Sequence, residues 1–167
     1  MRAVFLISGF LLFALATNSQ YYNKHYGVRM GSTFGVTAKV LKGDKLALEG
    51  MLGFRQRGMQ VYGFIESYQT AFSKKTDNMK IYFGPGAHLG FTTISANYYQ
   101  NNPYYYAPPD WAFYPVIGID GILGLEYWFP MAPVVIGIDW KPYFELESFY
   151  RPRFVFWDFG FSIKYVL

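Results

Sequence analysis

The chain has no cysteine, few charged residues and no long apolar run beyond its N-terminus. Without cysteine it has no disulfide framework, no thiol nucleophile and no thiolate metal site. Charged residues make up 16% of the sequence and form no Lys- or Arg-rich run, although the net charge is +4. Because nucleic-acid-binding proteins usually carry a clustered basic patch, we expect no nucleic-acid partner.

Aromatic residues are abundant: they make up 22% of the sequence, and most are Tyr or Phe. The mean hydropathy is only +0.08, whereas each span of a helical membrane protein needs about 20 consecutive apolar residues. A transmembrane β-barrel has a near-neutral average, because lipid-facing and lumen-facing residues alternate along each strand. A length of 167 residues suits one such domain.

The first residues have the pattern of a secretory signal peptide. Arg2 precedes an apolar run from Ala3 to Leu15, and Ala14-Leu15-Ala16 forms an A-x-A cleavage site before the polar residues 17–20. We predict a signal peptide over residues 1–16, with cleavage as late as residue 19, and a barrel over 17–167. A membrane anchor is the alternative, but the run is short for a span.

Beyond the signal peptide, apolar residues recur with a period of two, which is typical of β-strands. In the last strand the odd positions from Val155 to Leu167 are apolar or aromatic. The even positions, from Phe156 onward, include Asp158, Ser162 and Lys164. The same alternation predicts eight strands, at about residues 22–31, 34–41, 45–56, 59–70, 78–91, 114–129, 133–145 and 154–167. Turn-forming stretches separate several of them, and an even strand count is typical of bacterial outer-membrane barrels.

One face of these strands carries nearly all the charged side chains, and glycines accompany them. Eight strands enclose a space that side chains just fill, so the many Trp, Phe, Leu and Ile of the other face would overfill it. We therefore predict an all-β fold: an eight-stranded antiparallel up-and-down transmembrane β-barrel with a side-chain-filled interior. The predicted interior polar network, nearly balanced in sign, consists of Arg29, Lys39, Glu49, Arg55, Glu66, His88, Asp120, Glu126, Asp139, Lys141, Asp158 and Lys164. The alternative is a soluble lipocalin-like carrier with the opposite face inside.

With both termini periplasmic, residues 92–113 form a long external loop that is rich in Tyr, Asn and Pro. Its composition suits contact with a protein or glycan. The candidate contact residues are Tyr98, Tyr99, Tyr104, Tyr105, Tyr106 and Trp111. An aromatic belt with a Pro-stiffened loop on the barrel rim explains the same residues without a partner.

Four stretches carry a resemblance to a known family: Leu46–Gly50, Tyr82–Gly90, Gly118–Tyr127 and Asp139–Pro142. They resemble a largely uncharacterised family of small outer-membrane barrel proteins of Bacteroidota, similar in size and strand count to OmpX- and OmpA-type barrels. Pro85 departs from the family pattern, which has Gly there. The resemblance implies the fold, export and location in the cell outer membrane, and it supplies no catalytic residues.

The last strand also resembles the β-signal that the barrel-assembly machinery reads, although Leu167 stands where Phe or Trp is usual. The expected partners are thus outer-membrane lipid, the assembly machinery, and a protein or glycan at the external loops.

Candidate chemistry is sparse, because His25 and His88 are the only histidines. Some eight-stranded barrels modify lipid A with a His, a Ser and a carboxylate, but nothing in this sequence places a Ser beside His88. We predict no catalytic constellation, no cofactor and no metal. The favoured function is an outer-membrane barrel with a structural or surface-interaction role and no open pore; a lipid A-modifying enzyme is the alternative.

Overall fold

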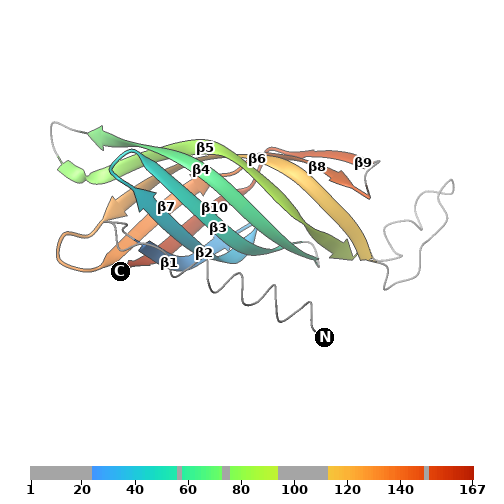
Figure 1. Ribbon diagram of the computed structural model, residues 1–167, viewed down its shortest axis with the longest axis horizontal. Helices are drawn as coiled ribbons and strands as arrows, with labels where there is room; N and C mark the ends of the chain where they lie inside the picture. The colour runs from blue at the N-terminus through green and yellow to red at the C-terminus, as the bar shows by residue number, and fades with distance from the viewer. Residues whose placement is uncertain (1–23, 56–57, 73–75, 94–112, 149–150) are drawn as a thin grey trace.

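The computed structural model describes residues 24–55, 58–72, 76–93, 113–148 and 151–167, and these form an antiparallel β-barrel (Figure 1). The predicted signal peptide, residues 1–16, lies outside this part of the chain. So do the predicted contact residues Tyr98, Tyr99, Tyr104, Tyr105, Tyr106 and Trp111. Within the described ranges, no helix is long and apolar enough to cross a membrane.

From β1 to β7, each strand pairs with the next one along the chain. The strands are β1 (Lys24–Gly31), β2 (Phe34–Lys42), β3 (Leu46–Arg55), β4 (Gly58–Phe72), β5 (Thr76–Thr93), β6 (Phe113–Trp128), β7 (Val134–Trp140), β8 (Tyr143–Glu147), β9 (Arg151–Val155) and β10 (Phe159–Val166).

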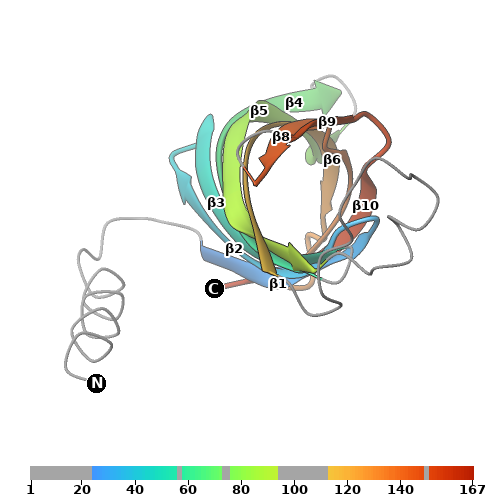
Figure 2. The same ribbon diagram turned by 90° about the vertical axis from the view of Figure 1, so that its right-hand side faces the viewer.

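β7 and β8 are two parts of one strand, since both pair with β6; β9 and β10 form the last strand in the same way. β1 pairs with both β2 and β10, and this pairing closes the ring that Figure 2 shows. The predicted eight-stranded antiparallel barrel is confirmed.

The register fixes how far the strands tilt. Pairing partners can be followed once around the barrel, from Glu147 through Val116, Gly90, Gln60, Gly53, Gly35, Arg29 and Ser162 to Gly137. Gly137 lies ten residues from Glu147 on the same strand, so the stagger is ten. For eight strands this corresponds to a tilt of roughly 40–45° and an interior just wide enough for side chains.

The two ends of the barrel differ. Strands β1, β3, β5 and β7 begin, and β2, β4, β6 and β10 end, at one end of the barrel, which we call the turn end. At the opposite end, which we call the loop end, β5 ends and β6 begins on either side of residues 94–112 in the sequence. Because 94–112 is by far the longest connection, the two ends have the asymmetry typical of outer-membrane barrels.

A β-bulge interrupts the last two strands at the same level. Trp140 pairs with Phe159 and Tyr143 with Val155, so two residues on one strand face three, 156–158, on the other. The Trp140 indole N–H donates to the Phe156 carbonyl at 2.6 Å and secures the irregular segment.

The bulge shifts the alternation by one residue, as an extra residue in one strand must. Phe156 and Trp157 are both exposed, and Asp158 is buried. The prediction that Phe156 shares the inner face with Asp158 is therefore wrong, because the period of two does not continue through the bulge.

Inward-facing glycines leave room for large side chains, and this can be tested with a matched pair. A Cβ at Gly124 would overlap the Tyr82 ring, whereas a Cβ at Gly63, on the outer face, would have nothing within 4 Å. We expect Gly124→Val to lower the free energy of unfolding by about 1–3 kcal/mol through overpacking, and Gly63→Val to leave it nearly unchanged. Urea titrations in detergent micelles measure both, and equal midpoints would contradict the assigned interior.

Candidate functional site

The interior of the barrel is where the structure concentrates its polar chemistry. All twelve residues of the predicted polar network lie inside, with side chains from every strand, and each residue is at most 7% exposed. Buried charges need partners, because an unpaired one costs several kcal/mol. The contacts fall into two groups, one toward each end of the barrel.

The turn-side cluster consists of Lys39, Glu49, Glu66, Glu126 and Lys164. The Lys39 ammonium is its centre and lies 2.8 Å from Glu49, 2.7 Å from Glu66 and 2.9 Å from Glu126. Lys164 lies 2.9 Å from Glu49 and 3.1 Å from Glu126, so two of the carboxylates bridge both ammonium groups. Three carboxylates thus surround two cations.

Tyrosines from β4 and β5 complete this cluster. The Lys39 ammonium donates to the Tyr68 hydroxyl at 2.7 Å, and that hydroxyl donates to Glu126 at 2.8 Å. The same ammonium lies 4.1 Å from the centroid of the Tyr82 ring. Cation–π contact strengthens when both groups are desolvated, as they are here.

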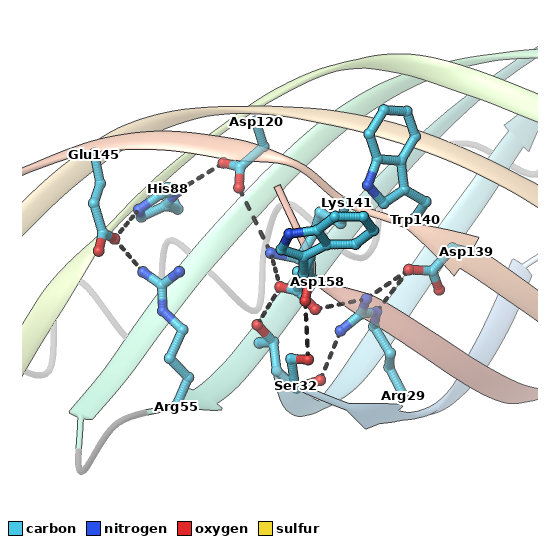
Figure 3. Close-up of polar contacts among 12 residues, drawn as sticks. Arg29, Ser32, Arg55, His88, Asp120, Asp139, Trp140, Lys141, Glu145 and Asp158 are labelled. Carbon is cyan, nitrogen blue, oxygen red and sulfur yellow. Dashed lines mark hydrogen bonds and ion pairs between the residues drawn. The ribbon is translucent and has the colours of Figure 1, made fainter. Parts of the chain in front are cut away.

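The second group, which we call the loop-side network, is a series of alternating acidic and basic side chains that begins at mid-barrel (Figure 3). Its members are Arg29, Arg55, His88, Asp120, Asp139, Lys141, Glu145 and Asp158. Arg29 donates to Asp139 at 2.9 and 2.6 Å and to Asp158 at 3.1 Å. Lys141 lies 2.8 Å from Asp158 and 3.7 Å from Asp120. Two aspartates, Asp158 and Asp120, therefore each join two basic groups.

The loop-side network continues toward the loop end through His88. Its Nδ1 lies 2.7 Å from Asp120, and its Nε2 lies 3.2 Å from Glu145. Glu145 also accepts a hydrogen bond from Arg55, and Arg153 lies 3.8 Å away at the rim. Arg55 stacks on the Tyr143 ring, 4.0 Å from its centroid.

The contacts of His88 determine its protonation. An ionised carboxylate only accepts hydrogen bonds, so a ring nitrogen facing one must carry a proton. Both nitrogens face carboxylates, and His88 is therefore an imidazolium. When His88 is counted as a cation, the loop-side network contains four acids, Asp120, Asp139, Asp158 and Glu145, and four bases, Arg29, Arg55, Lys141 and His88.

This arrangement braces the barrel and offers little for catalysis. Arg29 on β1 reaches Asp139 on β7, 110 residues away in the sequence, and Arg55 on β3 reaches Glu145 on β8. Since both His88 nitrogens are engaged by carboxylates, neither is available to activate a hydroxyl group. Among the described residues, no group of three or more His, Asp or Glu side chains could hold a metal ion.

Several interior residues were missed by the sequence analysis. Glu145 shares the parity of Asp139 and Lys141, so extending the alternation would have found it. Tyr62, Phe64, Tyr68 and Tyr82 are also buried, although the predicted interior network names no aromatic side chain. Glycines opposite them, such as Gly124 beside Tyr82, make the room and were the available signal.

Comparisons with known proteins add no relative: no protein-family model and no curated protein matches the chain.

Removing the central cation of the turn-side cluster tests whether ion pairing holds the barrel together. We expect Lys39→Met to lower the free energy of unfolding by about 3–5 kcal/mol, because it leaves three buried carboxylates short of a cation. Lys42→Met is the matched control on the same strand, exposed and at the turn end; it should change stability by less than about 0.5 kcal/mol. Equal losses, measured by urea unfolding in detergent, would exclude a special role for Lys39.

The charge state of His88 can be observed directly. We expect nitrogen NMR of the ¹⁵N-histidine-labelled protein at neutral pH to show both ring nitrogens of His88 protonated. His25 is an internal reference, because within the described part of the chain neither of its ring nitrogens has a hydrogen-bond partner. A single protonated nitrogen on His88 would mean that one of the two carboxylates is itself protonated.

Proposed function

We propose that the chain is an integral outer-membrane β-barrel protein with a closed interior and a structural or surface-interaction role. The observation that carries this proposal is the inverted distribution of polarity: the buried side chains include most of the charged side chains of the strands, and large apolar side chains cover the outside.

The outer apolar surface is continuous across neighbouring strands. Directly paired, outward-facing positions form an unbroken row of Val36, Leu52, Val61, Leu89 and Ile117 on five successive strands. Soluble monomers rarely expose contiguous apolar patches of more than a few hundred Å². Hydrocarbon, in contrast, solvates such a surface without cost, and barrel closure satisfies the backbone groups.

The same distribution argues against a soluble lipocalin-like carrier. A carrier of apolar ligands needs an apolar lumen, and this barrel has lysines and glutamates at its centre.

A pore is also disfavoured, because the ion pairs cross the lumen at both levels. We expect no stepwise conductance from the protein in planar bilayers.

Export and insertion are inferred from the sequence. The signal peptide over residues 1–16 would direct the chain across the inner membrane, and the apolar last strand would engage the barrel-assembly machinery. A surface-interaction role would belong to the loop end, where the long connection 94–112 joins β5 to β6. Lipid A modification is not favoured, because the His88 ring is held between two carboxylates.

An arginine on the outer face distinguishes lipid from water as the surroundings of the barrel. Ile65 lies in the middle of β4 and is 55% exposed. In a bilayer, Ile65→Arg should cost about 2–4 kcal/mol of folding free energy. Met131→Arg is the control, since Met131 is 99% exposed in the 129–133 turn and should tolerate the change.

Folding into lipid vesicles, followed by heat-modifiable gel migration, measures both variants. If Ile65→Arg folds as well as the parent protein, or if the parent protein stays folded and monodisperse in water without detergent, the membrane assignment is wrong.

A further inference from the structure

The turn end of the barrel carries a group of lysines on the side of β1, β2 and β3. Lys24 begins β1, Lys42 ends β2 and Lys45 directly precedes β3, so the three come from adjacent strands. All three are exposed. We call them the basic rim. Lys80 on β5 adds a fourth cation at the same end, 3.9 Å from the centroid of the Trp128 ring.

The basic rim lies where the outer apolar surface stops. On β1 the outward series Met30, Val28 and Tyr26 is followed at the next outward position by Lys24. On β2 the series Val36, Ala38 and Val40 is followed in the same way by Lys42. Lys45 stands immediately before exposed Leu46. A lysine at such a boundary can lay its stem on apolar surface and place its ammonium among polar headgroups.

Few acidic side chains offset the positive charge of the basic rim. Among the residues whose side chains the structure describes, none of its three ammonium groups forms an ion pair, and Asp44 is the one exposed acidic side chain at the turn end. This contrasts with the interior, where every lysine faces carboxylates. The charge of the rim is therefore available to an external anion.

The opposite side of the turn end is different in kind. The 129–133 turn between β6 and β7 has no charged residue; its Phe129 is 41% exposed and its Met131 is 99% exposed. The basic partners for an anionic headgroup therefore lie on the β1–β3 side of the turn end and not at this turn.

From this charge pattern, we infer that the basic rim of Lys24, Lys42 and Lys45 binds the headgroups of anionic phospholipids in the leaflet that surrounds the turn end. The inference rests on the proposed membrane location and adds a lipid class and a sector of the barrel to it. Lysines near an anionic bilayer surface each contribute about fivefold to binding, and the effect falls within a Debye length.

The test is lipid retention by the inserted barrel. The full mature chain is folded into nanodiscs that hold equal amounts of phosphatidylglycerol and phosphatidylcholine, and native mass spectrometry of the released protein counts the lipids of each class that stay bound. We expect the parent protein to retain phosphatidylglycerol about fivefold or more over phosphatidylcholine. The triple variant K24Q/K42Q/K45Q should retain both about equally, and K24R/K42R/K45R should keep the preference.

The outcomes separate this inference from the proposed function. Heat-modifiable migration first establishes that each variant is folded and inserted. An inserted parent protein without preference, or an inserted Gln variant with undiminished preference, overturns the lipid inference and leaves the membrane location intact. A parent protein that does not insert into nanodiscs of phosphatidylcholine alone contradicts the membrane location itself.

Discussion

Pairing of buried charge is the constraint on which the rest of this barrel depends. Lys39 is completely buried and is tolerated because three carboxylates and a tyrosine hydroxyl lie within 2.9 Å of its ammonium. The buried charges of the loop-side network are also paired, through aspartates that each contact two bases and a histidine that donates to two acids. Because several of these contacts, among them Lys39–Glu66, Lys39–Glu126 and Arg29–Asp139, join strands that are not neighbours in the sheet, they fix the cross-section of the barrel as well as its contents.

The constraint extends to the small and aromatic residues. A cation that approaches an acid across the lumen needs space, and inward-facing glycines provide it: a Cβ at Gly160 would overlap the Arg29 guanidinium. Buried tyrosines fill what the ions leave and offer hydroxyl groups or ring faces to the lysines, as Tyr68 and Tyr82 do for Lys39. The outer surface has no such requirement, so its residues are apolar and varied.

Much of this architecture could be predicted from the sequence, because a strand has a strict period of two. Parity alone separated Lys39 and Glu49 from Val36 and Leu48. The choice of partners could not be predicted, since it depends on the stagger of the closed barrel: Arg29 meets Asp139 only because β1 and β7 both pair with β10 in registers that bring the two side chains together. The bulge at Phe156 could not be predicted either, because the prediction assumes an uninterrupted period of two and an extra residue in one strand interrupts it. Function was less accessible still, because the residues that suggested a partner lie in the 94–112 connection, outside the described part of the chain.

The last strand has a particular place in the order of assembly. Asp158 borders it, and Lys164 lies within it, so each of the two ionic groups is completed by a residue that arrives last in the chain. Until that strand docks, Arg29 lacks one acid, and Glu49 and Glu126 each lack one base. A sheet whose first and last strands are not yet paired therefore has charged side chains without partners on its inner face, the face that excludes water after closure. Pairing of the first and last strands supplies these missing partners, so the ion pairs favour the closed barrel over the open sheet.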